Sequence, residues 1–415
     1  MSPPRPTRLT HSMQARAPDV KPLPPLLEGL RPGDPVAHVP TPALVVDLNA
    51  AERNLAAMAA FASAHRVRLR PHAKMHKSAA FARRQCEAGA VGVCVQTWSE
   101  AEALLTTSPE LDVFISNEIV DRRKLERLAA LLKAAPEAQV SIAVDSPLGI
   151  DRLLAALRPA GVVDRVGVLV EVDVGQGRCG VPPAQAGRLA RQVVSHGLKF
   201  LGLQAYHGKA QHLRSVADRA EASRQTARLA RAAQASVTAA GMSCALVTGG
   251  GTGTFPFDAT SGVYNEVQPG SYLFMDADYE RNEQPGGAPH FEQALYVKAQ
   301  VVSCGMAHVV VDAGHKAHAI DSGLPRVRGS SLVYRNGGDE HGLLEWPHEP
   351  VAHTGASPAG TSPAGQGLPQ IGDTVWLVPG HCDPTVNLHD AMVEVRGGLD
   401  DGVVERITVV DARGC

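Results

Sequence analysis

The chain has 415 residues, with 40 Lys and Arg against 42 Asp and Glu. This length allows two domains or one barrel with an appended unit, and the balanced charge argues against a nucleic-acid partner. No apolar run reaches membrane-spanning length, and the seven scattered cysteines are typical of reduced thiols in a cytoplasmic protein.

The N-terminal segment, residues 1–35, is rich in Pro and Arg and has no acidic residue before Asp19. It also lacks an apolar stretch of signal-peptide length. This composition predicts a disordered leader, with a targeting peptide as the alternative. We therefore expect the folded part of the chain to begin near residue 36.

From residue 41 onward, short β-branched or apolar runs alternate with longer Ala/Leu/Arg stretches of helical period. Their number and total length favour a (β/α)8 TIM-type barrel over residues 36–285. A doubly wound open sheet is the alternative, but no Gly-rich dinucleotide turn follows the first run. The expected strands are 43–48, 68–72, 91–95, 113–116, 140–144, 166–172, 200–206 and 245–247. The expected helices are 48–64, 100–105, 122–134, 149–157, 184–196 and 213–240.

The chain changes character after Tyr279, where short apolar runs are joined by Gly, Pro and Asp turns. This pattern predicts a C-terminal all-β domain over residues 286–415. Within it, residues 355–367 are Gly/Ala/Ser/Pro-rich and are expected to form a surface loop. The expected strands are 295–304, 308–313, 331–333, 374–378 and 407–410.

The octapeptide RPHAKMHK, residues 70–77, lies between an expected strand and an Ala-rich helical stretch. This places Lys74 at the mouth of a strand, among several other cations. Crowding by positive charge, or desolvation, favours the neutral amine and makes it a nucleophile toward a carbonyl. The chemistry indicated is a Schiff base to pyridoxal phosphate, and a solvated basic turn is the alternative.

Arg178, the pair Tyr206 and His207, and the glycine turn described below are expected on the same rim as Lys74, because catalytic groups of a barrel gather at the carboxyl ends of its strands. Tyr206 and His207 close the seventh expected strand, and Arg178 follows the sixth. A guanidinium there suits two-point binding of an anion. Gln96, at the end of the third strand, is a candidate for polar contacts to a cofactor ring.

The glycine turn TGGGTGT, residues 248–254, follows the eighth expected strand. Glycines let backbone N–H groups approach an anion without obstruction, and threonine hydroxyls add further donors. The turn therefore predicts a phosphate site, to which Tyr206 could also donate. Its candidate residues are Thr248, Gly249, Gly250, Gly251 and Thr252.

The sequence His381-Cys382-Asp383 lies in the β domain. On an extended segment residues i and i+2 share a face, so His381 and Asp383 would bind one metal ion while Cys382 points away. One imidazole and one carboxylate suit Mn²⁺, Mg²⁺, Co²⁺ or Zn²⁺ with open positions for a substrate. A polar turn before Pro384 is the alternative. The remaining histidines, including His212, carry less weight.

Taken together, these motifs resemble the fold-type III pyridoxal-phosphate enzymes, specifically the D-threonine aldolase/D-serine dehydratase family, over residues 36–410. The resemblance rests on residues 70–74, 177–180, 206–208, 248–254, 270–272, 275–276 and 381–383. It implies that Lys74 is the aldimine lysine, that the glycine turn holds the cofactor phosphate and that His381 and Asp383 bind a divalent ion. It also implies a homodimer.

The second ligand position separates two branches of this family, since dehydratases typically carry Cys and use zinc whereas D-threonine aldolases carry Asp. Asp383 makes the chain similar to the aldolase branch, with Mn²⁺ as the first expectation. The implied reaction cleaves D-threonine or another D-β-hydroxy-α-amino acid to glycine and an aldehyde. His207 would act as general base on the β-hydroxyl.

Three other functions stay open at this point. A D-serine or 3-hydroxy-D-aspartate dehydratase would use Lys74 to remove the α-proton. An amino-acid racemase would need a second base and no metal. A non-catalytic pyridoxal-phosphate carrier would generally lack the C-terminal β domain.

Overall fold

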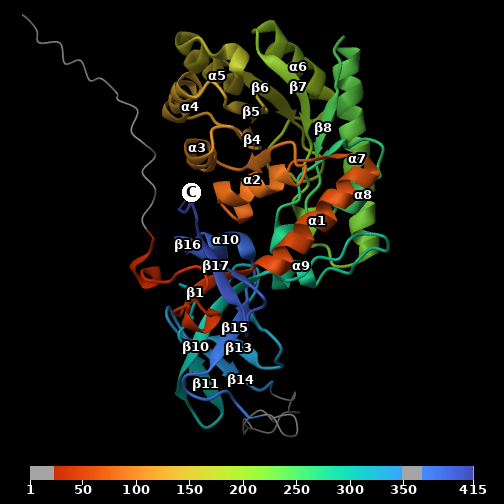
Figure 1. Ribbon diagram of the computed structural model, residues 1–415. Helices are drawn as coiled ribbons and strands as arrows, with labels where there is room; N and C mark the ends of the chain where they lie inside the picture. Colours follow the sequence, from red (N-terminus) through yellow and green to blue (C-terminus); the bar gives the residue numbers. More distant parts are fainter. Residues whose placement is uncertain (1–22, 348–366, 415) are drawn as a thin grey trace, which may run out of the picture.

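The computed structural model describes residues 23–347 and 367–414 of the chain, in two units (Figure 1). The upper unit is a parallel sheet surrounded by helices, and the lower unit is a mostly antiparallel sheet. The predicted TIM-type barrel followed by a C-terminal β domain is thereby confirmed in its architecture.

The barrel closes through its first two strands. Eight parallel strands run in the order β2-β9-β8-β7-β6-β5-β4-β3. The Cys94 N–H then donates to the Pro71 carbonyl at 2.7 Å, and the Val91 N–H donates to the Leu69 carbonyl at 2.9 Å. The strands are β2 (Arg68–Leu69), β3 (Val93–Val95), β4 (Asp112–Ile115), β5 (Gln139–Val144), β6 (Val166–Glu171), β7 (Lys199–Gln204), β8 (Leu246–Gly249) and β9 (Glu266–Val267).

Helices cover the outside of the barrel, and several begin at a capping side chain soon after a strand ends. In α3, for example, Thr97 and Glu100 form a reciprocal capping box. Leu125, Leu128 and Leu132 of α4 are buried at helical spacing. The longer helices are α1 (Leu48–His65), α2 (Ala79–Glu87), α3 (Trp98–Thr107), α4 (Arg122–Ala134), α5 (Pro147–Ala160), α6 (Ala186–Ser195) and α7 (Val216–Ala239).

One expected barrel strand belongs to the other sheet. Strand β1 (Ala43–Asp47) pairs antiparallel with β10 (Leu295–Cys304) and parallel with β16 (Ala391–Arg396). The assignment of residues 43–48 as the first barrel strand was therefore wrong. The sequence of an apolar strand is the same kind of pattern in either sheet. The sheet to which the strand belongs depends on its pairing partners, which are distant in sequence. The missing barrel strand is β9, which is too short to show a period.

The C-terminal sheet has nine strands in the order β11-β14-β13-β12-β15-β10-β1-β16-β17. Strands β10 and β15 have the predicted bounds, whereas β12, β14 and β16 were not predicted. The remaining strands are β11 (His308–Val311), β12 (Arg326–Val327), β13 (Val333–Asn336), β14 (Gly342–Glu345), β15 (Thr374–Val378) and β17 (Val403–Val409). The predicted loop at 355–367 lies outside the described residues, except for Gly367.

Part of the expected leader is folded against this sheet. Leu27 and Leu30 are buried in a core shared with the sheet. The Gly33 N–H donates to the Val404 carbonyl at 2.8 Å. The prediction of a disordered leader was therefore wrong for residues 23–35, because its few apolar side chains find a place in this core. Residues 1–22 lie outside the described residues.

The two units share one apolar core. Phe81 and Phe255 from the barrel pack in the same cluster as Val309 and Leu377 from the β domain. The short helix α10 (Cys382–Val386) of the β domain contacts the 3-10 helix η3 (Ala73–Met75), which follows β2. The β domain therefore faces the carboxyl ends of the barrel strands.

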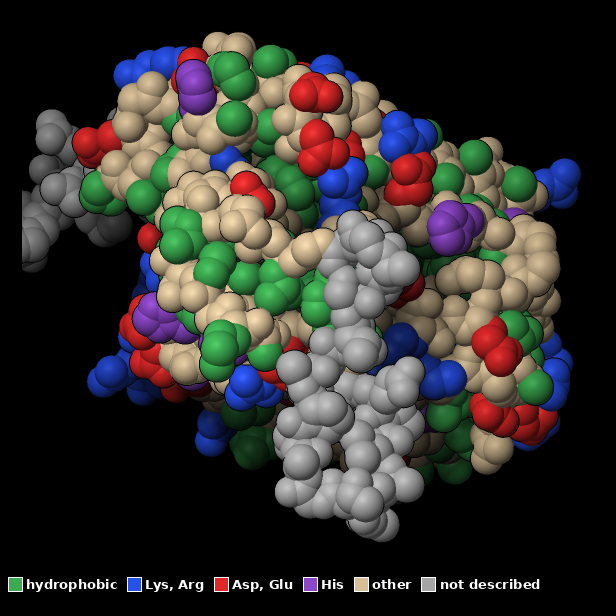
Figure 2. Space-filling model, turned by 90° about the horizontal axis from the view of Figure 1, so that it is seen from below, with side chains coloured by type: hydrophobic (Ala, Val, Ile, Leu, Met, Phe, Trp, Pro, Cys, Tyr) green, Lys and Arg blue, Asp and Glu red, His purple; other side chains and the backbone are tan. Residues whose placement is uncertain are grey.

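Seen from below, the molecule shows Lys and Arg side chains interspersed with Asp and Glu side chains (Figure 2). On the described part of this face the two signs of charge are mixed. None of the helices in the described segments combines the length and apolarity needed to cross a bilayer.

Candidate active site

The carboxyl end of the barrel has a polar floor. Because side chains alternate along a strand, every second residue faces the interior. Above an apolar interior layer that includes Phe114 and Leu169, the next interior side chains are polar. These are His72, Gln96, Ser116, Glu171, Gln204, Thr248 and Gln268.

Hydrogen bonds join neighbouring members of this floor. The Gln268 amide donates to Thr248 Oγ1 at 2.7 Å and to Gln204 Oε1 at 2.8 Å. On the opposite side, Ser116 Oγ lies 3.3 Å from His72 Nε2. Thr248 is therefore part of the floor, as is Gln96, whose side-chain amide donates to the Ser116 carbonyl at 3.3 Å.

Lys74 stands at the edge of this floor, in η3. His72 caps the short helix by accepting the Lys74 N–H at 3.4 Å. The Lys74 amine forms an ion pair with the Asp383 carboxylate of the β domain. Burial lowers the pKa of Lys74, but the charge of Asp383 outweighs it and raises the pKa above its ordinary value. The two domains thus meet at this amine.

The other residues of the basic octapeptide do not crowd Lys74 with charge. Burial lowers the pKa of His72 to about 3 and that of His76 to about 4, so both imidazoles are neutral. Arg70 and Lys77 each form an ion pair with a buried glutamate, at 3.1 and 2.8 Å. The expectation that neighbouring cations favour a neutral Lys74 was therefore wrong.

The glycine turn leaves no room for side chains. Gly250 has φ +74°, and a Cβ atom added there would lie 2.9 Å from an oxygen of Asp258. A Cβ atom added at Gly251 would lie 2.6 Å from Gln211 Oε1. One at Gly249 would collide with the Ala205 carbonyl. Only glycine fits these positions without displacing the neighbours.

Three consecutive backbone donors remain open in this turn. Within the described part of the chain, the N–H groups of Gly250, Gly251 and Thr252 have no protein acceptor. In contrast, the Gly253 N–H donates to Gln211 Oε1 at 2.9 Å. The Thr252 hydroxyl accepts the Tyr272 N–H at 3.1 Å. Successive open N–H groups on a glycine turn form an anion-binding nest.

Tyr206 lies between this turn and Lys74. Its hydroxyl would be 3.1 Å from a Cβ atom added at Gly251. Burial raises the pKa of Tyr206, and the nearby Lys74 charge lowers it. Arg178 is exposed on the loop after β6, close enough for its charge to act on Tyr206 and Glu171. The structure therefore brings Lys74, Tyr206, the turn and Arg178 to one rim.

The expectation that residues 381–383 form one extended segment was wrong, because Asp383 lies on a helix whereas His381 is extended. His381 is the N-cap of α10, and Cys382 and Asp383 form its first turn. Burial alone would raise the pKa of Asp383. The positive charges of Lys74 and His381 outweigh this effect, so the pKa lies below its ordinary value. His381 Nδ1 lies 2.6 Å from Asp321 Oδ2, which leaves Nε2 for another partner. Cys382 is buried, and its Sγ lies 3.3 Å from Asp383 Oδ1.

His207 is not brought to Lys74. Its Nδ1 lies 3.1 Å from Thr226 Oγ1 on α7. A Cβ atom added at Gly175 would lie 3.3 Å from its ring. Burial lowers the pKa of His207, whereas Asp173 raises it. Its role as a base stays a prediction that this position does not favour.

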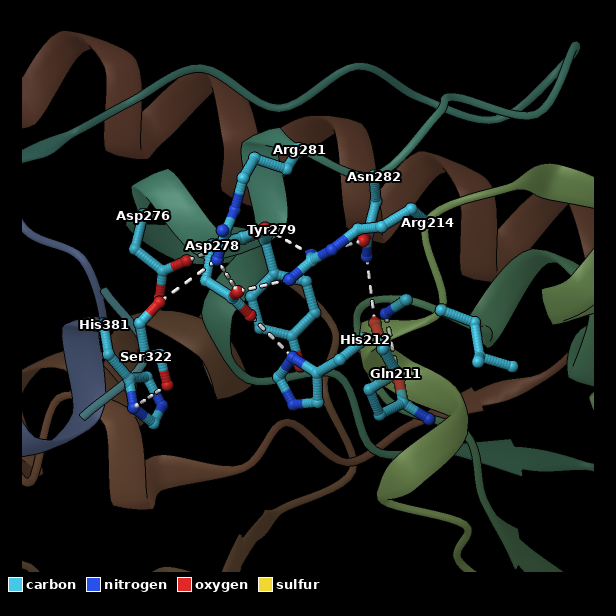
Figure 3. A network of polar contacts seen from close by, with 12 residues as sticks. Gln211, His212, Arg214, Asp276, Asp278, Tyr279, Arg281, Asn282, Ser322 and His381 are labelled. Atoms are coloured by element: carbon cyan, nitrogen blue, oxygen red, sulfur yellow. Dashed lines mark hydrogen bonds and ion pairs between the residues drawn. The ribbon is translucent and has the colours of Figure 1, made fainter. Parts of the chain in front are cut away.

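His212 is the imidazole that the sequence reasoning undervalued. It ends the 3-10 helix η6 (Lys209–His212), and its side chain is 44% exposed. Its Nδ1 lies 2.6 Å from Asp278 Oδ2 on α9 (Ala277–Glu280), as Figure 3 shows. Its ring lies 5.4 Å from that of Tyr279, whose pKa is raised by burial and by the charges of Tyr206 and Asp383. His212 thus adjoins the rim, although no motif marks it.

Comparison with known proteins agrees with this geometry. Residues 46–278 match the alanine racemase N-terminal domain, and residues 294–395 match the putative serine dehydratase domain. The chain is 44% identical over 388 residues to the D-threonine aldolase of an Arthrobacter species, covering 92% of this chain and 95% of that protein. The chain belongs to the D-threonine aldolase/D-serine dehydratase family.

Two further members of this family are similar over nearly the whole chain. A 3-hydroxy-D-aspartate aldolase of Paracoccus denitrificans is 40% identical over 393 residues, covering 92% of this chain and 94% of that protein. The crystal structure of D-threonine aldolase from Filomicrobium marinum is 44% identical, with a TM-score of 0.83. The match covers 93% of this chain and 98% of that chain.

The fold-type III family binds pyridoxal phosphate, and the mouth of this barrel fits that cofactor. The open N–H groups of the glycine turn suit its phosphate, and Lys74 supplies an amine for its aldehyde. Between them, the polar floor lies where the ring would rest. The cofactor fit therefore depends on the glycine turn, Lys74 and the polar floor.

Proposed function

We propose that the chain is a pyridoxal-phosphate- and divalent-metal-dependent aldolase that cleaves D-threonine or another D-β-hydroxy-α-amino acid to glycine and an aldehyde. One observation carries the proposal: the Lys74 amine contacts Asp383, so the proposed cofactor lysine and the predicted metal ligand lie side by side where the two domains meet. The names of the two aldolase relatives support it. Asp383 also provides the hard oxygen ligand that distinguishes this branch.

The cofactor would be held by residues of the rim. Lys74 would take its aldehyde, and the N–H groups of Gly250, Gly251 and Thr252 would bind its phosphate with help from the Tyr206 hydroxyl. Thr248 and Gly249 shape the approach, and Gln96 and Arg178 would contact the ring. When bound, pyridoxal phosphate supplies an electron sink for the electrons of the broken Cα–Cβ bond.

The Gly251→Ala variant tests the phosphate site. The added methyl group would lie 2.6 Å from Gln211 Oε1, so the turn must shift and lose its donor geometry. We expect the affinity for pyridoxal phosphate, measured by titration of the apoenzyme, to fall by about tenfold, equivalent to the loss of one or two hydrogen bonds. Gly286→Ala, at a site with open space, is the matched control. Equal affinities in both variants would argue against the turn as the phosphate site.

The metal ion would be held by His381 Nε2 and the Asp383 carboxylate, with Mn²⁺ as the first candidate and Mg²⁺, Co²⁺ or Zn²⁺ as alternatives. Asp383 would then exchange its Lys74 partner for the ion. Among the described residues, no cluster of three or more His, Cys, Asp or Glu side chains is arranged for a metal. Two protein ligands leave open positions, where a Lewis acid makes a hydroxyl easier to deprotonate.

We place the proton transfer at His212. Asp278 accepts the hydrogen of Nδ1, which leaves the lone pair of Nε2 available. Nε2 would remove the proton of the substrate β-hydroxyl as the Cα–Cβ bond breaks and the aldehyde forms. Protonation of Cα then gives glycine. His207 contacts Thr226 of α7 and would stabilise the loop that follows β7.

Product analysis tests the whole proposal. The metal-loaded enzyme with D-threonine should give glycine and acetaldehyde, and activity should disappear with EDTA and return with Mn²⁺. Ammonia and a 2-oxo acid from D-serine or 3-hydroxy-D-aspartate would identify a dehydratase instead. Activity that survives complete metal removal would favour a racemase, and an absence of turnover with bound cofactor would favour a carrier.

We further infer a cytoplasmic homodimer that has a small-molecule substrate and neither nucleic acid nor membrane as a partner. The six described cysteines are free thiols, which suits a reducing compartment. The chain has a mass of 43.7 kDa, so light scattering distinguishes a dimer from a monomer.

A further inference from the structure

Asp278 is the centre of a polar network beside the proposed site (Figure 3). Its side chain is only 5% exposed, yet it accepts hydrogen bonds from three residues. His212 Nδ1 and Arg214 Nη2 each lie 2.6 Å from a carboxylate oxygen, and Arg281 makes the third contact. Burial alone would raise the pKa of Asp278. His212 and Arg214 outweigh this effect and lower the pKa below its ordinary value, so the carboxylate stays charged.

The helix that carries Asp278 is fixed to the proposed metal-binding segment. One oxygen of Asp276 caps α9 by accepting the Tyr279 N–H at 2.9 Å. The other accepts the Cys382 N–H, also at 2.9 Å. The Ala277 N–H donates to the Pro379 carbonyl at 2.9 Å. Helix α9 and the residues that flank His381 therefore form one unit.

Arg281 extends this connection to the imidazole of His381. Its guanidinium contacts both Asp278 and the Ser322 carbonyl, the latter at 3.1 Å. The Ser322 hydroxyl lies 3.2 Å from His381 Nδ1. His212 and His381 are thus joined through a continuous set of hydrogen bonds and ion pairs.

The same network reaches the glycine turn on its other side. Arg214 Nη1 donates to Asn282 Oδ1 at 2.7 Å, and the Asn282 amide donates to the Gln211 carbonyl at 2.9 Å. The side chain of Gln211 then holds the Gly253 N–H. Arg214 Nη1 also donates to the Asp278 backbone carbonyl at 2.7 Å, so a change of the Asp278 side chain alone leaves this connection to the turn in place.

We propose that Asp278 is a positioning residue that fixes the ring and tautomer of His212 relative to the metal-binding segment and the glycine turn. This rests on the proposed function, in which His212 removes the hydroxyl proton. A carboxylate that accepts from Nδ1 keeps Nε2 unprotonated and holds the ring plane. Arg214 and Arg281 keep the carboxylate anionic, so it remains an acceptor. A side chain as exposed as His212 would otherwise rotate freely.

The test compares Asp278→Asn with Glu280→Gln in the holoenzyme. Glu280 lies on the same helix but makes an exposed ion pair with Arg326. We expect Asp278→Asn to lower kcat by about 10- to 100-fold, as is usual for partners that orient a functional histidine. KM and the cofactor content should stay within about twofold of the parent enzyme, and Glu280→Gln should leave all three values unchanged.

Two further measurements separate positioning from a general loss of structure. The Asp278→Asn effect should vanish in a His212→Asn background, because the two residues act as a unit. The ¹⁵N shifts of His212, assigned by their loss in His212→Asn, should move toward a mixture of tautomers in Asp278→Asn. Asp278→Glu, which keeps the charge, should restore part of both readouts if the asparagine variant folds poorly.

An unchanged kcat in Asp278→Asn, or an equal loss with and without His212, would overturn the proposal. Unaltered ¹⁵N shifts would overturn it as well. If His212 is not the base, the result is different: the His212→Asn variant would cleave D-threonine at the normal rate. The ¹⁵N shifts would still report whether Asp278 sets the tautomer of His212.

Discussion

Replacement of Lys74 by alanine should abolish covalent attachment of pyridoxal phosphate and lower turnover by at least about 1,000-fold, as for the removal of other covalent catalytic groups. Lys74 is the amine that η3 holds between the polar floor and Asp383, beside the Tyr206 hydroxyl. The measurement is the visible absorbance of the bound cofactor, followed by borohydride reduction and peptide mapping.

Lys74→Arg separates attachment from structure, because arginine keeps a charge for Asp383 but cannot bond the cofactor aldehyde in the same way. It should bind the cofactor reversibly and leave the domain contact intact. Lys316→Ala, which removes an exposed surface lysine, serves as the control and should retain the absorbance. Reducible cofactor that persisted on Lys74→Ala would contradict the assignment.

The second large effect is expected at His212. Its replacement by asparagine should lower kcat for D-threonine by about 10²- to 10⁴-fold, the usual contribution of a general base. The cofactor should still bind, because neither Lys74 nor the glycine turn loses a ligand contact. The rate of aldehyde release is measured in an assay that couples it to enzymatic reduction of the aldehyde. The cofactor absorbance is measured in the same samples.

His207→Asn is the matched comparison, since it changes the other imidazole of the same loop. We expect a much smaller loss, because the His207 ring contacts Thr226 of α7. A larger loss from His207→Asn than from His212→Asn would restore the base assignment derived from sequence. It would also remove the functional basis of the role given to Asp278.

The longer elements of the fold could be predicted from the sequence because their periodicity is local. Helix α4 and strands β10 and β15 have the predicted bounds. Strand β9 has two residues, too few to reveal a period. Strand β1 was predicted as a strand but placed in the wrong sheet, because sheet membership depends on β10 and β16, hundreds of residues away.

The site was predictable where strand ends determine it. Lys74, Tyr206 and the glycine turn follow barrel strands directly, so their common rim follows from topology. The contact of His212 with Asp278 joins residues 66 positions apart through two short helical turns, and no spacing rule indicates it.

The geometry of the metal pair was misjudged for a local reason. Residues 381–383 were expected to be extended, with a polar turn before Pro384 as the alternative. Proline is also tolerated in the first turn of a helix, which is where α10 places it.

The pairing of β1 with β10 and β16 makes the barrel an insertion within the β domain. Two covalent connections tie it there, one between β1 and α1 and the other between α9 and β10. A body tethered at two points and packed into a core shared with its host cannot turn freely relative to that host. The insertion therefore holds the strand end that carries Lys74 opposite the β-domain segment that carries Asp383.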